Sequence, residues 1–528
     1  MSQGGEPPWH NTLKCIQHAA STAAFEELEA ALEALLRGWA NNPAAVLDVA
    51  ALLLQIGHLS RVEELLIWCH QLNPQSHGPL LNLASLWLQT LRQEQSLALY
   101  RQLPPSSNYL MALAYQTDAT ANLALAEARA WFAEIQPQPP RLPPPPFKRL
   151  TDAPLRLGFL SADLCQHPVG LLLLPLVLAL SGRSDLELFF YDNSLRSDWL
   201  SHILQAYGTW RSVVAAADPQ VARQIQSDQL DVLIELGGHT ARSRLAVLAL
   251  RPAPLQLSWL GYWASTGMTT AVDGVLVDSL VVPPGSPEAA SFCEPLLQMA
   301  NGRWCYQPVP WMPEVVDPPC LSRGWVTFGS FNHAAKFSRA VLSCWAALMR
   351  AVPSSRLLLK NYQLQDPKLR GSLRGLMASE GIKPDRLELQ GPSFHSDLLL
   401  SYAKIDIALD PFPFNGGFTS CEALWLGVPL VTLEGHNKAA VMAARQGVAL
   451  LKQINRPEWV ATNEPHYVQI AAGLAANPEA LRVLRHSQRG RMQNSPLCDQ
   501  EGFSTEFLKV IRQAAERKFG VTKQIFNP

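Results

Sequence analysis

The 528-residue sequence is poor in charged residues and has almost no net charge. Asp, Glu, Lys and Arg together make up 16% of the chain, and the formal net charge at pH 7 is −1. Nucleic-acid-binding proteins usually carry a basic surface, so this balance argues against a nucleic-acid partner. The hydrophobic share of 48% excludes an intrinsically disordered chain and indicates a large core, with length for roughly three domains.

The sequence also lacks the patterns of secreted, zinc-binding and membrane-spanning proteins. The nine cysteines are scattered and form no CxxC pair, which favours reduced thiols over a disulfide framework or a zinc site. The N-terminal residues MSQGGEPPWHN have neither the basic start nor the apolar core of a signal peptide. The most apolar stretch, 169–180, is shorter than the ~20 residues that cross a bilayer. We therefore expect a cytoplasmic protein without a membrane partner.

A helical repeat pattern covers the N-terminal quarter of the chain. Apolar residues recur at helical spacing in five segments: 25–36, 46–56, 62–72, 80–91 and 124–135. Pro43, Pro74, Pro105 and Pro137 follow one another at intervals of 31 or 32 residues. Helix pairs of ~34 residues with a proline-bearing turn are typical of tetratricopeptide repeats (TPR). We expect a TPR-like domain at 1–140 that binds an extended peptide, or serves only as a packing platform or dimer contact.

The rest of the chain predicts an α/β fold. A proline-rich run at 137–146 indicates a stiff linker, which we place at 141–153. Strand patterns then alternate with helix patterns over 154–320 and again over 321–520. This alternation predicts two Rossmann-like domains, each with a parallel sheet.

Ligands of such sheets bind beyond the C-terminal ends of the strands, and several polar side chains lie there in the first α/β domain. They are His167, Glu235, His239 and Tyr262. A histidine in a strand-exit loop can act as a general base because its pKa lies near neutrality, although many such histidines are structural. Spacing alone does not choose between His167 and His239.

The segment 406–433, DIALDPFPFNGGFTSCEALWLGVPLVTL, predicts a strand, a glycine-rich loop, a helix and a second strand. We expect a helix at 421–426 that Thr419 or Ser420 caps and Gly427 ends. A glycine-rich turn before a helix N-terminus suits a phosphate or diphosphate, although short loops of this kind also occur as plain connections. Lys336 follows a predicted strand at 326–328, where we expect a helix to begin; it either neutralises a diphosphate or is a solvated lysine.

Five motifs in order resemble glycosyltransferase family 41, the protein O-GlcNAc transferases and their SPINDLY relatives. They are SADLCQHPVG, ELGGHT, LRPAPLQLSWLGYWASTG, GSFNHAAK and LDPFPFNGGFTSCEALWLGVPLVTL. The resemblance covers about 155–518, and helical repeats before this region are also the family's arrangement. It implies a GT-B fold with a nucleotide-sugar donor in the interdomain cleft. It also implies inverting transfer to Ser or Thr hydroxyls of proteins, without a metal or a cofactor.

The resemblance also implies roles for individual residues. His167 matches the family's active-site histidine near the acceptor, and Lys336 matches a lysine on the donor diphosphate. The other residues that match donor-site positions are Asn332, His333, Gly416, Gly417, Thr419 and Glu422, the last of them near the ribose. His239 and Tyr262 are expected to line the acceptor side or the cleft.

The chain departs from the family pattern at positions around the donor. Phe418 stands where relatives have a threonine, and Leu398 where many have a histidine, with His395 three residues away. Val441 stands where O-GlcNAc transferases tend to have an arginine. These departures leave open which nucleotide sugar is the donor and how strongly it binds.

We expect transfer of N-acetylglucosamine from UDP-GlcNAc to protein Ser or Thr hydroxyls. The alternatives are SPINDLY-type fucosyl transfer from GDP-fucose, another hexosyl donor, or a TPR scaffold with impaired catalysis. The expected partners are acceptor proteins that bind the helical repeats, and a homodimer is left open.

Overall fold

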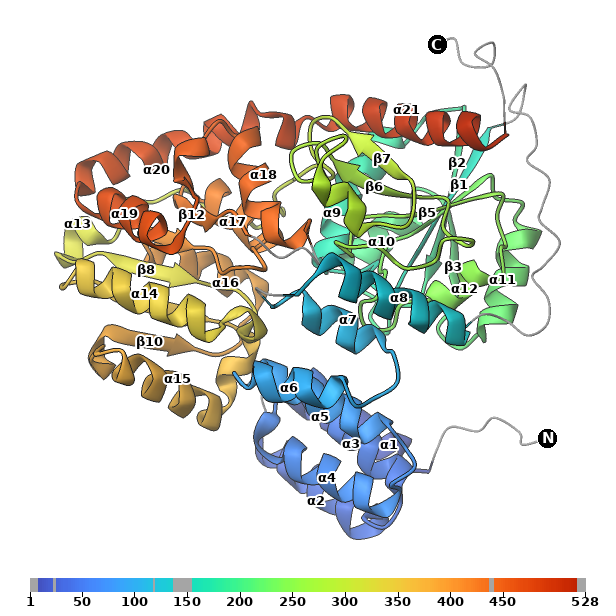
Figure 1. Cartoon of the computed structure of the whole chain (residues 1–528), viewed down its shortest axis with the longest axis horizontal. Helices are drawn as coiled ribbons and strands as arrows, with labels where there is room; N and C mark the ends of the chain where they lie inside the picture. Colours follow the sequence, from blue (N-terminus) through green and yellow to red (C-terminus); the bar gives the residue numbers. More distant parts are fainter. Residues whose placement is uncertain (1–7, 22–24, 117–118, 136–153, 436–440, 520–528) are drawn as a thin grey trace. The chain divides into compact units, whose positions relative to one another are not determined.

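The structure is a computed structural model that describes residues 8–21, 25–116, 119–135, 154–435 and 441–519. It divides into two compact units (Figure 1). The first unit contains 1–104 and 327–398, and the second contains 105–326 and 399–528. The predicted linker at 141–153 lies outside the described residues, and the domain boundaries expected from the sequence stay predictions.

The N-terminal residues form antiparallel helix pairs, as the repeat pattern predicted. The first unit contains α1 (His10–Ser21), α2 (Phe25–Trp39), α3 (Pro43–Gln55), α4 (Val62–Leu72), α5 (Gly78–Gln89) and α6 (Gln93–Tyr100). α7 (Ser107–Leu113) and α8 (Ala121–Ile135) belong to the second unit. Pro43 is the first residue of α3, after Asn42, whose side chain accepts hydrogen bonds from the backbone N–H groups of Ala44 and Ala45. Pro43, Pro74 and Pro105 thus mark junctions between helix pairs, while Pro137 lies outside the described residues.

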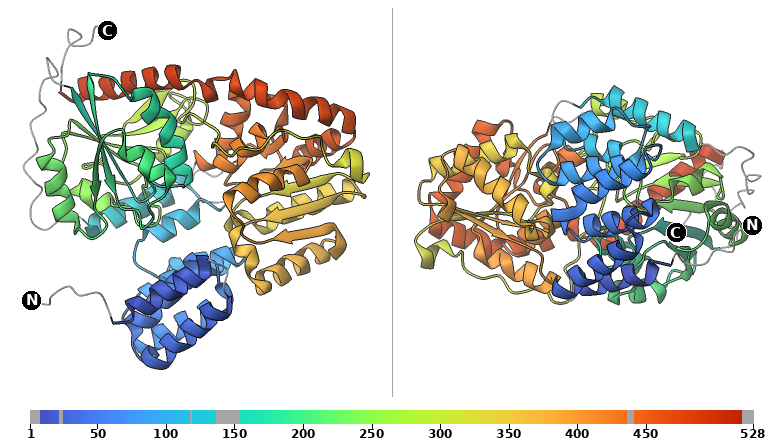
Figure 2. Two further views of the ribbon diagram at one scale, coloured as in Figure 1. Left: turned by 180° about the vertical axis from the view of Figure 1, so that it is seen from behind. Right: turned by 90° about the horizontal axis from the view of Figure 1, so that it is seen from below.

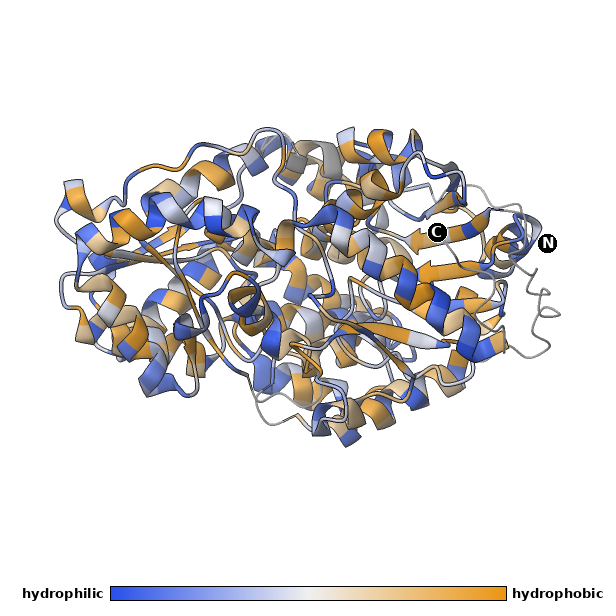
Figure 3. Cartoon of the chain, turned by 90° about the horizontal axis from the view of Figure 1, so that it is seen from above, coloured by the Kyte–Doolittle hydropathy of each residue, from blue (hydrophilic) through white to orange (hydrophobic). Residues whose placement is uncertain are grey.

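The first sheet is a seven-stranded parallel sheet in the order β3-β2-β1-β4-β5-β6-β7. Its strands are β1 (Leu155–Ser161), β2 (Leu186–Asp192), β3 (Thr209–Ser212), β4 (Val232–Glu235), β5 (Leu255–Ser258), β6 (Gly274–Asp278) and β7 (Leu296–Met299). The helices α9 (Pro168–Leu180), α10 (Trp199–Gln205), α11 (Asp218–Ser227) and α12 (Leu245–Ala249) lie around it (Figure 2, left). The central strands are buried and mostly apolar, which explains the hydrophobic runs in the sequence (Figure 3).

Three further parallel strands lie in the first unit in the order β10-β9-β8, and three lie in the second unit in the order β11-β12-β13. β8 (Thr327–Ser330), β9 (Arg356–Lys360) and β10 (Leu387–Gln390) come from the first unit. β11 (Ile407–Leu409), β12 (Leu430–Leu433) and β13 (Val460–Ala461) come from the second. The remaining helices are α13 (Cys320–Arg323), α14 (Arg339–Ala351), α15 (Pro367–Ser379), α16 (His395–Ser401), α17 (Phe418–Trp425), α18 (Gln446–Gln453), α19 (Glu464–Ala475), α20 (Pro478–Gln493) and α21 (Gln500–Phe519).

The predicted α/β architecture is confirmed. The strands that the sequence patterns do not indicate are β3, β6, β7 and β13. β3 and β7 alternate or expose their side chains, and β13 contains only two residues, so none of them is a continuous apolar run. β6 follows β5 without an intervening helix, so the strand–helix alternation does not mark it. No helix within the described ranges is both long enough and apolar enough to cross a membrane.

Helices α7 and α8 pack on the first sheet through His239, which follows β4. The Ser107 hydroxyl at the start of α7 lies 2.9 Å from His239 Nδ1, and Nε2 lies 2.9 Å from the carbonyl oxygen of Thr266. A carbonyl oxygen only accepts, so Nε2 carries the proton and Nδ1 accepts from Ser107. The Trp131 ring of α8 meets the imidazole edge-on, with ring centroids 4.5 Å apart. Burial lowers the pKa of His239 to about 4, so the ring is neutral at pH 7.

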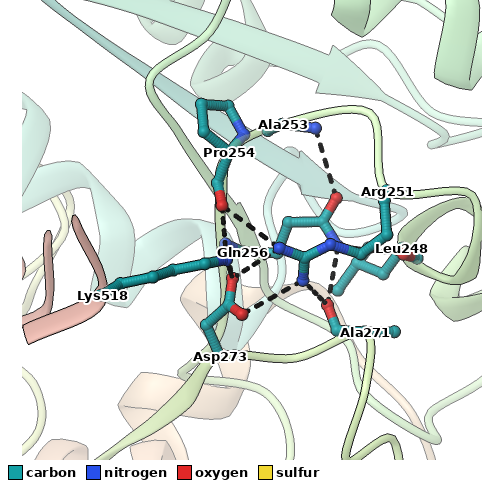
Figure 4. Close-up of polar contacts among 8 residues, drawn as sticks. All are labelled: Leu248, Arg251, Ala253, Pro254, Gln256, Ala271, Asp273 and Lys518. Carbon is teal, nitrogen blue, oxygen red and sulfur yellow. Dashed lines mark hydrogen bonds and ion pairs between the residues drawn. The ribbon is translucent and has the colours of Figure 1, made fainter. Parts of the chain in front are cut away.

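A polar cluster around Asp273 attaches the C-terminal helix α21 to the first sheet (Figure 4). Arg251 donates two hydrogen bonds to the Asp273 carboxylate, at 3.1 and 3.2 Å, and Lys518 of α21 lies 2.6 Å from the same group. Arg251 also donates to the carbonyl oxygen of Ala271, and Gln256 donates through its backbone N–H to Asp273. The LRPAPLQL motif that contributed to the family resemblance therefore has a structural role here.

Replacement of Arg251 by methionine is expected to destabilise the second unit by about 3 kcal/mol, because it removes a guanidinium from a largely buried carboxylate and two carbonyl groups. The side chains of Arg251 and Asp273 are only 13% and 19% exposed. Urea denaturation monitored by fluorescence measures the change. The matched control is Arg183→Met, whose partner Asp185 is 48% exposed and which is expected to cost less than ~1 kcal/mol. Equal losses in the two variants would contradict the role of the cluster.

The pH dependence of stability tests the neutral state of His239. Its folded-state pKa of about 4 lies below the ~6.5 expected in the unfolded chain, so the unfolded state binds a proton first as pH falls. The contribution of neutral His239 to the free energy of unfolding is complete above pH 6.5. It is lost as the pH falls from about 6.5 to 4, by up to ~3 kcal/mol. Denaturation at pH 7 and pH 5 is expected to show a larger loss for the wild-type protein than for His239→Gln. The same loss in both proteins would exclude a buried neutral histidine.

Candidate active site

The predicted diphosphate loop connects β11 to α17 in the second unit, and two buried side chains hold it. The Asp410 carboxylate accepts hydrogen bonds from the Gly416 N–H, at 2.5 Å, and from the Thr432 hydroxyl, at 2.7 Å. Asn415 accepts from the Gly447 N–H and donates to the Pro411 carbonyl. Asp410 and Asn415 are completely buried, so the loop is held by hydrogen bonds from the protein interior. Neither residue was among the site residues predicted from the sequence.

Helix α17 begins without a side-chain cap, which corrects the expectation that Thr419 or Ser420 is the cap. The helix starts at Phe418 after Gly417, and its first backbone bonds run from the N–H groups of Ser420 and Cys421 to the Gly417 carbonyl. Thr419 and Ser420 are therefore inside the first turn. Gly427 does end the helix, with the predicted left-handed conformation at φ +79°. The uncapped start leaves N–H groups and the positive end of the helix dipole for an anionic ligand.

Gly416 is required by close packing rather than by an unusual backbone angle. Neither Gly416 nor Gly417 has a positive φ, but a Cβ on Gly416 would lie 2.3 Å from the Ser420 hydroxyl oxygen and 3.0 Å from Asp410 Oδ1. The Ser420 hydroxyl is buried, and no hydrogen-bond partner for it is found in the described parts of the chain. A side chain at position 416 would displace the loop from Asp410.

The remaining side chains of the loop face the protein interior. Glu422 is 1% exposed and lies 3.5 Å from the Tyr402 hydroxyl, which donates to the Thr419 carbonyl at 2.9 Å. Burial, reinforced by Glu422, raises the pKa of Tyr402 well above its usual value. The Phe418 ring packs against Tyr306, with centroids 5.6 Å apart. The aromatic side chain at 418 is thus part of the core of this region.

The predicted lysine loop lies in the first unit, after β8. Lys336 Nζ donates to Asn332 Oδ1 at 3.2 Å, and the Asn332 backbone carbonyl accepts from the Asn361 side chain at 3.0 Å. Lys336 ends a short 3-10 helix, η3 (Ala334–Lys336), and α14 begins only at Arg339, so the predicted helix start is three residues early. The loop brings Asn332, His333 and Lys336 together.

Glutamine side chains connect this lysine loop to the helical repeats of the same unit. His333 Nδ1 accepts from the Ala335 N–H at 3.2 Å, and its Nε2 contacts the Gln363 side chain. Gln363 donates in turn to Gln89 of α5 at 3.3 Å, and Gln93 of α6 donates to the Ala335 carbonyl at 3.4 Å. The repeats therefore contact the loop that carries the predicted donor residues. These contacts join distant parts of the chain, so no local sequence pattern could indicate the role of Gln363.

His167 lies in the second unit, between β1 and α9, and is the N-cap of α9. Its Nδ1 lies 3.3 Å from the Val169 N–H and 3.6 Å from Asp163 Oδ2, and its side chain is 43% exposed. Desolvation of the ring lowers the pKa of His167, and Asp163 opposes that shift. Since Nε2 takes no part in these contacts, His167 has a nitrogen available for a substrate.

His239 and Tyr262 lie together in the interior of the second unit. Tyr262 is 4% exposed, and its ring meets the His239 ring with centroids 5.2 Å apart. The neighbouring Trp263 packs on Phe414 of the diphosphate loop, at 4.4 Å between centroids. Both nitrogens of His239 are already hydrogen-bonded, so these residues support the loop from inside. The contacts that His167 makes within the described part of the chain are all at Nδ1. Among the described residues no group of three or more His, Cys, Asp or Glu could hold a metal ion.

Comparison with known proteins identifies relatives over most of the chain. The profile of "Glycosyl transferase family 41" matches residues 141–305 and 320–507. The rice protein named "Probable UDP-N-acetylglucosamine--peptide N-acetylglucosaminyltransferase SPINDLY" is 35% identical over 407 residues, which are 75% of this chain and 43% of that protein. The SEC protein of Arabidopsis thaliana, whose name gives the same transferase activity, is 27% identical over 75% of this chain and 41% of its own length. The chain thus spans less than half the length of these curated relatives.

A solved structure matches the fold over nearly the whole chain. The O-GlcNAc transferase of Thermobaculum terrenum, in a single-residue variant, superposes with a TM-score of 0.83 at 30% identity. The match covers 97% of this chain and 99% of that one. It confirms the predicted GT-B architecture with preceding helices. On the family profile and these relatives together, the chain belongs to glycosyltransferase family 41.

Proposed function

We propose that the protein transfers N-acetylglucosamine from UDP-GlcNAc to Ser or Thr hydroxyls of proteins, with inversion at the anomeric carbon. The observation that carries this proposal is the match to the Thermobaculum terrenum O-GlcNAc transferase over 97% of the chain. The printed names of the SPINDLY and SEC relatives, which give the same donor and a peptide acceptor, support it. They do not favour GDP-fucose or another hexosyl donor.

In this reaction the acceptor oxygen forms a bond to C1 of the sugar while the bond between C1 and the diphosphate oxygen breaks. The hydroxyl proton goes to a base, and UDP leaves with the bonding electron pair. The protein must therefore align a hydroxyl, remove one proton and stabilise a growing negative charge on the diphosphate. Each of these tasks matches a group described above.

The loop at 416–419 is suited to hold the diphosphate. The Gly416 N–H is bound to Asp410, but the N–H groups of 417–419 precede the first intrahelical bonds of α17, and the helix dipole adds partial positive charge at the same place. Asp410 and Asn415 fix the loop before a ligand arrives, so little reorganisation is needed as charge develops. Thr419 and the buried Ser420 supply hydroxyl groups in the same turn.

Lys336 supplies the cation for the same leaving group, and Asn332 holds its ammonium group in one direction. Asn332 and His333 line the donor, and Glu422 lies near the ribose. His167 is the base, because its Nε2 is available while both nitrogens of His239 are not. The reaction needs no metal and no cofactor.

The helical repeats bind acceptor proteins, for which stacked helix pairs provide an extended concave surface. The contacts of Gln89 and Gln93 with the lysine loop support this proposal, because they join the repeats to the proposed donor residues of the first unit. We further infer a cytoplasmic protein.

Thermal stability in the presence of nucleotides tests the donor. A ligand that binds only the folded state at a hundred times its Kd adds ~2.7 kcal/mol, so UDP and UDP-GlcNAc at millimolar concentration are expected to raise Tm. GDP and GDP-fucose serve as matched controls and are expected to have little effect. A preference for the guanine nucleotides would replace the proposed donor, and no shift with any nucleotide would favour a scaffold without catalysis.

Replacement of Lys336 by methionine is expected to lower kcat by about a hundredfold or more, because it removes a charge that stabilises the leaving diphosphate. Radiolabelled sugar transfer to protein acceptors measures the effect. Lys383→Met in the same unit is the control, since Lys383 is exposed on the surface and is expected to have no effect. Unchanged turnover of Lys336→Met would reject this role.

A further inference from the structure

Asp163 and His167 lie four residues apart in the loop between β1 and α9, with Oδ2 and Nδ1 separated by 3.6 Å. The Asp163 side chain is 21% exposed. Its backbone N–H donates to the Ser161 hydroxyl at 3.0 Å, so the residue is held at the end of β1. His167 is the one described side chain that an ion pair or hydrogen bond joins to the Asp163 carboxylate. The carboxylate is thus directed at the imidazole.

The two neighbours of His167 Nδ1 require opposite protonation states. In the structure Nδ1 accepts a hydrogen bond from the Val169 N–H at 3.3 Å, which requires an unprotonated Nδ1. The Asp163 carboxylate, at 3.6 Å, lies at ion-pair distance, and it could accept a hydrogen bond only from a protonated Nδ1. In a neutral imidazole the proton is on one nitrogen. With the Val169 contact the proton is on Nε2, which then cannot accept a proton from a hydroxyl. With the Asp163 contact the proton is on Nδ1, and Nε2 has a lone pair.

We propose that Asp163 is a positioning residue that keeps the proton of His167 on Nδ1 and so makes Nε2 the basic nitrogen. The inference rests on the proposed function, in which His167 Nε2 takes the acceptor proton. When that proton arrives, the imidazolium formed donates from Nδ1 to Asp163, and the ion pair stabilises it. A carboxylate that orients a catalytic histidine in this way is a general arrangement in hydrolases.

The other charges near this pair come from neighbouring loops. Arg196 opposes protonation of His167, while Asp198 is occupied by the Gln166 N–H at 2.7 Å. Glu235 at the end of β4 and Arg242 in the loop that follows also interact electrostatically with Asp163. The Glu235 oxygens already accept the Gly237 and Gly238 N–H groups, at 2.8 and 2.7 Å. Asp163 is therefore the carboxylate that meets the His167 ring.

The variant Asp163→Asn tests the inference. An amide of the same shape can keep the loop conformation, but it has no negative charge to stabilise the imidazolium of His167. Turnover at pH 7 is expected to fall on the order of tenfold to a hundredfold, since a general base contributes ~10²–10⁴ and its favoured tautomer is lost. The acid limb of the kcat–pH profile is expected to move to lower pH, because the pKa of His167 falls without the carboxylate. Stabilisation by UDP is expected to stay unchanged, and Asp163→Glu is expected to recover part of the turnover.

Two further measurements separate this role from a structural one and from the proposed function. In a His167→Ala background the Asp163→Asn change is expected to lower turnover little further. The two residues act together as one base, so removing His167 already removes the effect of Asp163. Nitrogen-15 NMR of neutral His167 reads the tautomer without activity; we expect Nδ1–H in the wild type and a shift toward Nε2–H in Asp163→Asn. The same tautomer in both proteins, or equal losses of turnover with and without His167, would overturn the inference. An inactive wild type with the expected tautomer change would count against the proposed function alone.

Discussion

The buried carboxylate of Asp410 is the group on which the loop between β11 and α17 depends. It has no exposure to solvent, and it joins the end of β11 to the Gly416 N–H and to the Thr432 hydroxyl of β12. Its own backbone carbonyl accepts a hydrogen bond from Tyr467 of α19 at 3.0 Å. A charge in the interior is tolerated only with such partners, so the loop, the strand and the helix are fixed relative to one another by one residue. The N–H groups at the start of α17 are consequently directed before any ligand binds.

The two histidines at strand ends show how local packing divides equivalent sequence signals into different roles. Both follow a buried strand, and both lie beside glycine or proline. His239 is enclosed by α7 and α8, hydrogen-bonded at both nitrogens and neutral. His167 caps a helix, keeps one nitrogen unoccupied and lies beside a carboxylate. The difference comes from the residues that pack on each ring. For His239 these include Ser107 and Trp131, which lie more than a hundred residues away in the sequence.

Much of the fold could be predicted because its elements carry local signals. Continuous apolar runs such as 155–161 and 430–433 identified buried strands, and the spacing of prolines identified the junctions of the helix pairs. The predicted cap of α17 was wrong because the helix begins at Phe418, so that Thr419 and Ser420 lie inside its first turn. The glutamine contacts of the lysine loop and the enclosure of His239 were not predictable, since each joins segments far apart in the chain. Most residues with candidate roles came from the family resemblance, and the structure supplied the groups that hold them.

The division of the helical array between the two units constrains how the protein can gain or lose repeats. Helices α1–α6 belong to one unit, while α7 and α8 provide Ser107 and Trp131, which enclose His239 in the other. Insertion or deletion of whole helix pairs before Pro105 leaves this enclosure intact. The same change after Pro105 would open the interior of the first sheet to solvent. Among the described helices, α7 and α8 are therefore part of the core of the second unit, and their loss would have a different cost from the loss of an earlier helix pair.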